Sequence, residues 1–180
     1  MAVHERNGLR EDWVMKNSAL VNDMMGDVTD FDFLVGSWIV LNRRLVTRGV
    51  GCTEWDEFSA TYRCQQYLDG VANVDEMLVP SKGFSGMTLR TFDIAARRWA
   101  IYWINSGNGI LCPPVFGGFN GNRGDFYGTD IADGKPVAVH FVWQRYGVDE
   151  ARWYQEFSSD GEVWETNWIM EFTRVHPSAP

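Results

Sequence analysis

Three side chains, His140, Tyr102 and Arg90, place a reactive group inside a mainly apolar segment of the sequence. A histidine there could act as a general base near neutral pH, or serve as a haem ligand. Tyr102 could donate a hydrogen bond to a carbonyl group, and Arg90 could hold a carboxylate or an enolate. Each residue also has a structural interpretation: a packed core histidine, a packing tyrosine, and an arginine in a cross-strand ion pair.

Motifs of other chemistries are missing from the sequence. It contains no GxSxG elbow, no P-loop, no HExxH and no GxGxxG after a strand. The cysteines (Cys52, Cys64 and Cys112) have no CxxC spacing, and only 3 histidines accompany them, so we expect no metal site. We also expect no cofactor, with haem at His140 as the exception considered.

The composition indicates an acidic, aromatic-rich single domain. The chain has 180 residues and a net charge of −8, which gives no electrostatic footprint for nucleic acid or an anionic membrane. It lacks an apolar leader and any long apolar run, so we expect a cytoplasmic protein; a homodimer is compatible with the sequence. The 9 Trp, 11 Phe and 6 Tyr either pack as cross-strand pairs or line a pocket.

Regular turns and alternating apolar residues predict antiparallel strands from residue 37 onward. The expected strands are 37–47, 53–66, 70–79, 84–94, 98–105, 123–132, 136–146, 151–158 and 162–174. Turns such as Asp69-Gly70, Asp133-Gly134 and Asp160-Gly161 separate them. Strands so evenly spaced predict an all-β antiparallel barrel of about 8–10 strands, closed or nearly closed.

Two segments do not fit the strand pattern. Residues 1–29 form an N-terminal extension with an amphipathic helix at about 10–25, either a plug in the barrel or a lid over its mouth. Residues 106–122 are rich in glycine and predict a long loop that flanks the cavity. The barrel itself is expected to span 30–175, with a disordered tail at 176–180.

Alternation sorts side chains into faces without always saying which face is inside. Trp99 and Trp103 lie opposite Tyr102, and Trp143 lies opposite His140, with both faces largely apolar. In 162–174, Trp164, Thr166 and Trp168 are expected to share one face. The candidate ligand contacts are Trp99, Trp103, Trp143, Trp168, Asn73, Phe116 and Phe119, and the candidate catalytic residues are His140, Tyr102 and Arg90.

The sequence Gly36-Ser37-Trp38 is the GxW pattern found at the first strand of calycin-type barrels. Glycine permits a tight turn into the strand, and the tryptophan then points inward and closes that end. In lipocalins an arginine from the final strand covers this tryptophan. Arg174 is placed to do so here through a cation–π contact.

Longer stretches carry a family resemblance. "FDFLVGSWIV" and "LRTFDIAARRWAIYWINSGNG" resemble a bacterial family of lipocalin-like proteins of unknown function, whose members begin FDFLxGxWxV. The resemblance covers about residues 30–174 and implies a calycin-like barrel. The nitrobindin-like haem barrels share the GxW start more distantly. This sequence reads "GSWIVLN" and lacks their following glycines, which disfavours haem.

Three functions fit this fold. The first is a barrel that binds a small hydrophobic or aromatic metabolite in an aromatic-lined cavity. The second is a cofactor-independent enzyme, an isomerase, cyclase or hydrolase, that acts on such a molecule in the same cavity. The third is a haem-binding barrel. The orientation of His140 is the observation that separates them, because the second and third depend on it.

Overall fold

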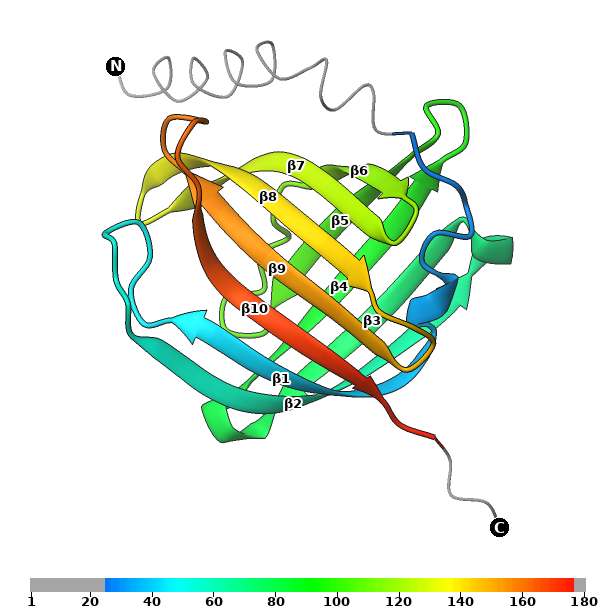
Figure 1. Cartoon of the computed structure of the whole chain (residues 1–180), viewed down its shortest axis with the longest axis horizontal. Helices are drawn as coiled ribbons and strands as arrows, with labels where there is room; N and C mark the ends of the chain where they lie inside the picture. The colour runs from blue at the N-terminus through cyan, green and yellow to red at the C-terminus, as the bar shows by residue number, and fades with distance from the viewer. Residues whose placement is uncertain (1–24, 177–180) are drawn as a thin grey trace.

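The computed structural model describes residues 25–176, which form a closed antiparallel barrel of ten strands (Figure 1). The first five strands are β1 (Gly36–Leu45), β2 (Trp55–Tyr67), β3 (Ala72–Val79), β4 (Phe84–Asp93) and β5 (Arg98–Asn105). The second five are β6 (Val115–Asn120), β7 (Arg123–Ala132), β8 (Lys135–Arg145), β9 (Glu150–Ser158) and β10 (Glu165–Arg174). Three short 3₁₀ turns complete the elements: η1 (Asp32–Leu34), η2 (Leu68–Gly70) and η3 (Pro80–Lys82).

Each strand pairs with its neighbour in the chain, and β1 pairs with β10 to close the barrel. Closure satisfies the backbone groups that an open sheet would leave at its two edges. The all-β barrel expected from the sequence is therefore confirmed. The predicted helix at residues 10–25 lies outside the described residues except for Met25, as does the predicted tail except for His176.

One end of the barrel is closed by residues that precede β1. Phe31 and Leu34 are almost fully buried there, and Phe31 packs edge-on against Trp99, with ring centroids 5.1 Å apart. The indole of Trp99 also donates a hydrogen bond to the carbonyl of Asp27 (3.0 Å). We call this the closed end. It lies on the right in Figure 1, where η1 meets the sheet.

The contacts of Gly36 and Trp38 at the closed end explain the GxW pattern. Trp38 is 1% exposed and donates its indole N–H to the carbonyl of Leu34 at 2.8 Å. The guanidinium carbon of Arg174 lies 4.1 Å from the centroid of the Trp38 ring, so the expected cation–π contact is confirmed. Gly36 has φ = +121°, and a Cβ there would lie 2.9 Å from Nη1 of Arg174. Only glycine fits both the backbone and the arginine.

The segment 106–122 was expected to be a loop, and this is wrong for its second half. Residues 115–120 form β6, which pairs with β5 and β7. The glycines within β6 mark close backbone approach: a Cβ at Gly117 would lie 1.9 Å from the carbonyl oxygen of Asp125. A Cβ at Gly118 would lie 2.7 Å from Cα of Gly26. The glycines of this segment therefore reflect close packing within a strand and not a loop.

A β-bulge in β10 corrects a second expectation. The register of β10 against β9 shifts between Thr166 and Trp168, with Asn167 as the extra residue. Trp168 therefore points inward, whereas Thr166 and Trp164 lie on the outer face beside residues of β7, β8 and β9. Strict alternation had placed all three on one face. The bulge reverses the phase of the strand.

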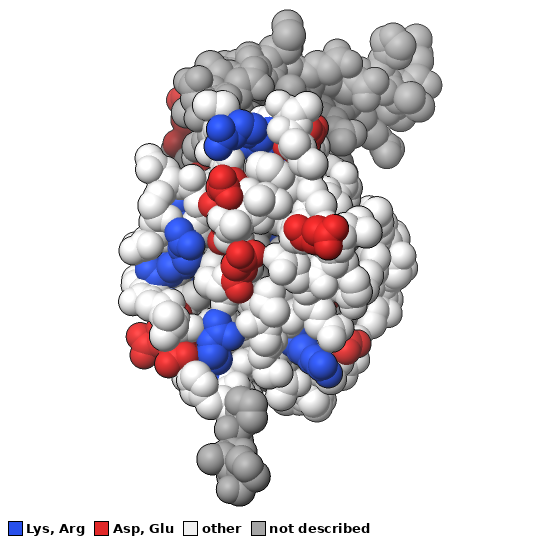
Figure 2. All heavy atoms as spheres, turned by 90° about the vertical axis from the view of Figure 1, so that its right-hand side faces the viewer, with Lys and Arg blue, Asp and Glu red and all other residues white. Residues whose placement is uncertain are grey.

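The other end of the barrel, at the left of Figure 1, carries the β1–β2, β3–β4, β7–β8 and β9–β10 connections and the β5–β6 loop. We call it the open end. The surface of the closed end, which faces the viewer in Figure 2, intersperses acidic and basic side chains. Among residues 25–176, none belongs to a helix with the length and apolar character needed to cross a membrane.

Candidate functional site

The barrel interior holds a cavity of about 90 Å³ with mainly aromatic walls. The four tryptophans Trp103, Trp143, Trp153 and Trp168 line it together with Phe141. They come from β5, β8, β9 and β10, and strand alternation turns all of them inward. Trp168 packs edge-on against both Trp103 (6.1 Å) and Trp153 (5.8 Å). These contacts hold the rings in fixed positions around the cavity.

A buried polar network lies at one wall of the cavity. Nη1 of Arg90 donates to Asp75 at 2.5 Å and to Asn73 at 3.0 Å. The hydroxyl of Tyr62 donates to the same Asp75 oxygen at 2.6 Å and accepts a hydrogen bond from Nη2 of Arg90 at 3.2 Å. Arg90 and Asp75 are 2% and 1% exposed. Arg90 and Tyr62 reach the cavity wall, with the Arg90–Asp75 ion pair behind them.

The electrostatics of this network keep Arg90 charged. Burial alone opposes a positive charge, but Tyr62 and Asp75 outweigh it and keep the pKa of Arg90 above its ordinary value. Burial also raises the pKa of Tyr62, so its hydroxyl stays protonated near neutral pH. The guanidinium lies 5.0 Å from the ring centroid of Phe31 and 5.6 Å from that of Trp143. Two aromatic rings thus lie within cation–π distance of this guanidinium.

Two donors in this region have no hydrogen-bond partner among the described residues. They are Nε of Arg90 and Nε1 of Trp143, and both side chains line the cavity. A buried donor without an acceptor costs free energy, so such groups are rare in folded proteins and often mark a site. Two side chains of the cavity wall thus each carry a buried N–H group that has no acceptor among the described residues.

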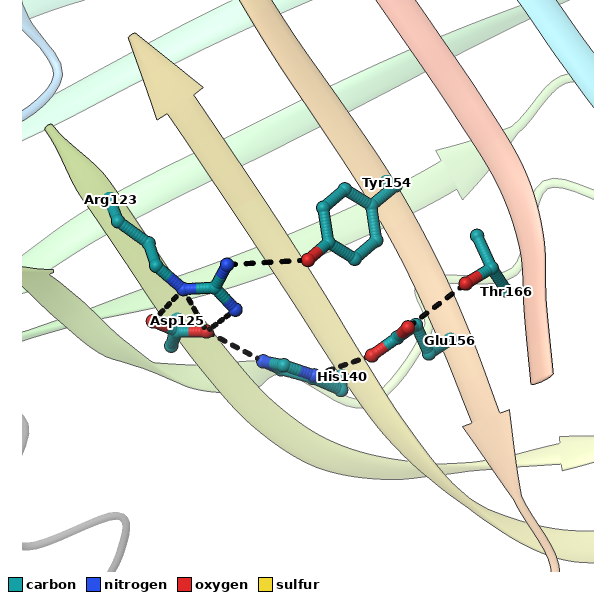
Figure 3. Close-up of polar contacts among 6 residues, drawn as sticks. All are labelled: Arg123, Asp125, His140, Tyr154, Glu156 and Thr166. Carbon is teal, nitrogen blue, oxygen red and sulfur yellow. Dashed lines mark hydrogen bonds and ion pairs between the residues drawn. The ribbon is translucent and has the colours of Figure 1, made fainter. Parts of the chain in front are cut away.

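The structure places His140 on the outer face of the barrel, not in the cavity (Figure 3). Nδ1 of His140 lies 2.9 Å from Glu156, and Nε2 lies 2.9 Å from Asp125. The imidazole stacks on Tyr127 with centroids 4.1 Å apart. Arg123 pairs with Asp125, as Figure 3 also shows. His140 thus links β7, β8 and β9 from outside, and an interior general base or haem ligand at this position is wrong.

Two carboxylates set the charge of His140. Burial opposes protonation, but the hydrogen bonds to Asp125 and Glu156 outweigh it and raise the pKa of His140. The hydrogen bond to His140 in turn lowers the pKa of Glu156. Burial raises the pKa of Asp125, but the hydrogen bonds from His140 and Arg123 outweigh burial and lower it. Because each ring nitrogen lies beside a carboxylate, the imidazolium form, which has two N–H donors, is favoured.

The other predicted site residues divide between the cavity and elsewhere. Trp103, Trp143, Trp168 and Arg90 line the cavity, and Asn73 accepts a hydrogen bond from Arg90. Trp99 and Phe119 are buried at the closed end, outside the cavity lining. Tyr102 lies on the opposite face of β5 from Trp103. Phe116 lies on the outer face of the barrel, with its ring centroid 4.8 Å from the guanidinium carbon of Arg98. Neither can reach a molecule in the cavity.

Sequence reasoning missed several cavity residues. Trp153 and Phe141 complete the aromatic wall, and Tyr62 and Asp75 form the polar network with Arg90. In the structure, β2 pairs with β3 so that Tyr62 opposes Met77 and Cys64 opposes Asp75. Only the pairing register brings the two side chains together across the strands. That register could not be read from alternation within a single strand.

Comparison of the sequence with family models and with curated proteins gives no match. Among solved structures, the chain is similar to the S-type phycobiliprotein lyase CPES from Guillardia theta. The TM-score is 0.55 at 10% sequence identity, over 89% of this chain and 98% of that one. This similarity establishes a shared barrel fold.

A second similarity is to a protein of unknown function of the DUF3598 family from Nostoc punctiforme. Its TM-score is 0.45 at 9% identity, and the match covers 85% of this chain but 51% of that one. The chain thus matches about half the length of that protein.

Proposed function

We propose that this protein binds a small hydrophobic or aromatic molecule in the cavity between Trp103, Trp143, Trp153 and Trp168. The observation that carries the proposal is the combination of an aromatic wall with the unpartnered N–H groups of Arg90 and Trp143. Small-molecule sites typically have such apolar walls and a few fixed polar groups that orient the ligand. The bound molecule would stack or pack edge-on against the indoles and place an acceptor atom near Arg90.

The cavity volume limits the size of the ligand. About 90 Å³ is smaller than typical pockets for drug-sized molecules, which span about 300–1,000 Å³. A single-ring or fused two-ring compound is therefore favoured over a large macrocycle. The similarity to a phycobiliprotein lyase supports the barrel architecture, and at 10% identity it transfers no ligand to this chain.

A binding function is favoured over the enzymatic and haem alternatives because of where the titratable groups lie. His140 and Tyr102 lie on the outer face of the barrel, so a reaction in the cavity would depend on the polar side chains that line it, among them Arg90, Tyr62, Gln155, Asp130 and Cys112. Arg90 and Tyr62 are already engaged with Asp75. A charged arginine and a protonated tyrosine can orient a ligand, but neither is a general base near neutral pH.

Calorimetric titration with indole tests the proposal. Val139 is 3% exposed and lines the cavity, so Val139→Phe should fill space that the ligand needs. We expect Val139→Phe to weaken indole binding by about tenfold or more, a difference of ~1.4 kcal/mol. The control is Val148→Phe, because Val148 is 78% exposed in the β8–β9 turn. Equal binding by a folded Val139→Phe variant and the control would refute the cavity as the site.

A further inference from the structure

Two arginines, Arg44 and Arg48, lie at the open end of the barrel. Arg44 lies on β1 in phase with the inward-facing Trp38, Val40 and Asn42. Its guanidinium carbon is 5.3 Å from the ring centroid of Trp168. Because Trp168 also lines the cavity, Arg44 adjoins the cavity wall.

Aromatic rings surround Arg44 on several sides. Besides Trp168, the centroids of Phe58 and Phe84 lie 5.4 and 5.6 Å from its guanidinium carbon. Rings of this kind stabilise the faces of a guanidinium but leave its five N–H donors to seek acceptors. Among residues 25–176, Arg44 forms no ion pair and its side chain donates no hydrogen bond.

Arg48, in the β1–β2 connection, is the second cation. Its guanidinium carbon lies 5.7 Å from the Phe157 ring centroid, and it too forms no ion pair within the part of the chain that the structure describes. Burial and then the charge of Arg44 lower the pKa of Arg48. The carboxylates of Asp133, Asp130 and Glu165 act in the opposite sense and raise it.

Neighbouring cations differ from this pair. Arg43 points outward and pairs with Glu57 at 3.1 Å, and Lys82 pairs with Asp56 at 2.7 Å. Glu165 accepts hydrogen bonds from the backbone N–H groups of Gly49 and Gly51. In the part of the chain that the structure describes, no carboxylate forms an ion pair with Arg44 or Arg48.

A surface groove of about 470 Å³ makes both arginines accessible. Arg44, Arg48 and Lys82 line it together with Glu54 and Asp56. The groove thus holds one positive charge in excess, although the whole chain carries −8. An apolar cavity and a cationic groove meet at the contact between Trp168 and Arg44. This arrangement suits a molecule with an apolar end and an anionic end.

We infer that the ligand of the cavity is an aromatic molecule that carries an anionic group, and that Arg44 and Arg48 bind this group at the open end. The inference rests on the proposed function, because it extends a molecule held among the tryptophans toward the groove. Arg44 forms the inner contact beside Trp168, and Arg48 forms the outer contact in the β1–β2 connection. The guanidinium fork matches the geometry of a carboxylate, which is the simplest such group.

Titration calorimetry with three probes tests the inference on the unmodified protein. The probes are indole, indole-3-acetate and indole-3-acetamide, which share the ring and differ in the side group. We expect the acid to bind at least about tenfold more tightly than the amide, as charge-assisted hydrogen bonds are the stronger kind. Equal affinities for acid and amide, or binding of indole alone, would overturn the inference and leave the cavity function standing. Failure of all three to bind would overturn both.

Variants assign the preference to the two arginines. Arg44→Gln and Arg48→Gln should each reduce affinity for the acid by roughly five- to tenfold and leave affinity for the amide unchanged. Arg43→Gln is the matched control: it removes the same charge from the adjacent position, where the side chain points outward. If Arg44→Gln proves unstable, Arg48→Gln, in an exposed connection, carries the test. A loss of acid affinity that Arg43→Gln reproduces would overturn the assignment.

Discussion

The guanidinium of Arg174 lies over the indole of Trp38, with its carbon 4.1 Å from the ring centroid. It also donates to the carbonyls of Val35 and Val148, both at 2.8 Å, and to that of Phe33. One side chain thus ties the last strand to the segment before β1 and to the β8–β9 turn. The contact joins the beginning and the end of the barrel across the β1–β10 pairing.

Removing Trp38 should be among the most damaging single changes in the barrel. Trp38 is 1% exposed and packs against Phe172 as well as Arg174. We expect Trp38→Ala to lower the free energy of unfolding by ~3–5 kcal/mol, measured by urea denaturation. A loss below about 1 kcal/mol, the size of an ordinary surface effect, would show that this ring is not part of the core.

Gly36 should tolerate no side chain. Alanine at this position would face the positive φ of +121° and the Arg174 contact at 2.9 Å, so we expect Gly36→Ala to destabilise the protein by roughly 1–3 kcal/mol. Gly147→Ala is the control, because a Cβ there meets nothing within 4 Å. The melting temperatures of the two variants, measured by thermal unfolding, are compared. Similar melting temperatures for the two would refute the role given to Gly36.

The Arg90–Asp75 pair should be costly to break on one side and cheaper to replace as a whole. Arg90→Met leaves the buried carboxylate of Asp75 without its cation, so we expect a loss of ~3–5 kcal/mol in unfolding free energy. The double variant Arg90→Met/Asp75→Leu removes both charges and should recover at least about 1 kcal/mol of that loss. Strictly additive losses in this double-mutant cycle would mean that the two charges do not stabilise each other.

His140 should make stability depend on pH in a defined direction. Its pKa is raised above the ordinary 6.5, so its contribution is complete below pH 6.5 and is lost as pH rises through the higher folded value. The pKa values of Asp125 and Glu156 are lowered from 3.8 and 4.5, so their contribution is complete above pH 4.5 and is lost as pH falls further. The cluster therefore stabilises most between about pH 4.5 and 6.5.

Denaturation at several pH values tests this with His140→Gln. The stability difference between wild type and His140→Gln should be largest near pH 6 and shrink toward pH 9, because the imidazolium loses its charge. His176→Gln is the control, since His176 is exposed and remote from the cluster, beside Asp149. A difference that grows as pH rises would contradict the orientation of charges around His140.

The sequence predicted the barrel because turns and alternation repeat from residue 37 onward, and the resemblance of its GxW start to that of lipocalins implied the Trp38–Arg174 contact. It could not orient β5 and β8, because both faces of these strands are apolar. That is why His140 and Trp143, on opposite faces of β8, were both candidates for the site. Strand β6 was missed because its glycines resemble those of a loop. The bulge at Asn167 was missed because one extra residue reverses the phase of a strand without a visible signal in the composition.

The central claim is that a small aromatic molecule binds inside the barrel among the tryptophans. Methyl-labelled methionine gives the most direct measurement, because Met77 and Met170 line the cavity whereas Met87 and Met25 are exposed at 39% and 61%. On addition of indole, ring currents should shift the NMR signals of Met77 and Met170 and leave Met87 unchanged. Shifts confined to Met87 or Met25, or no shift at saturating indole, would contradict the claim.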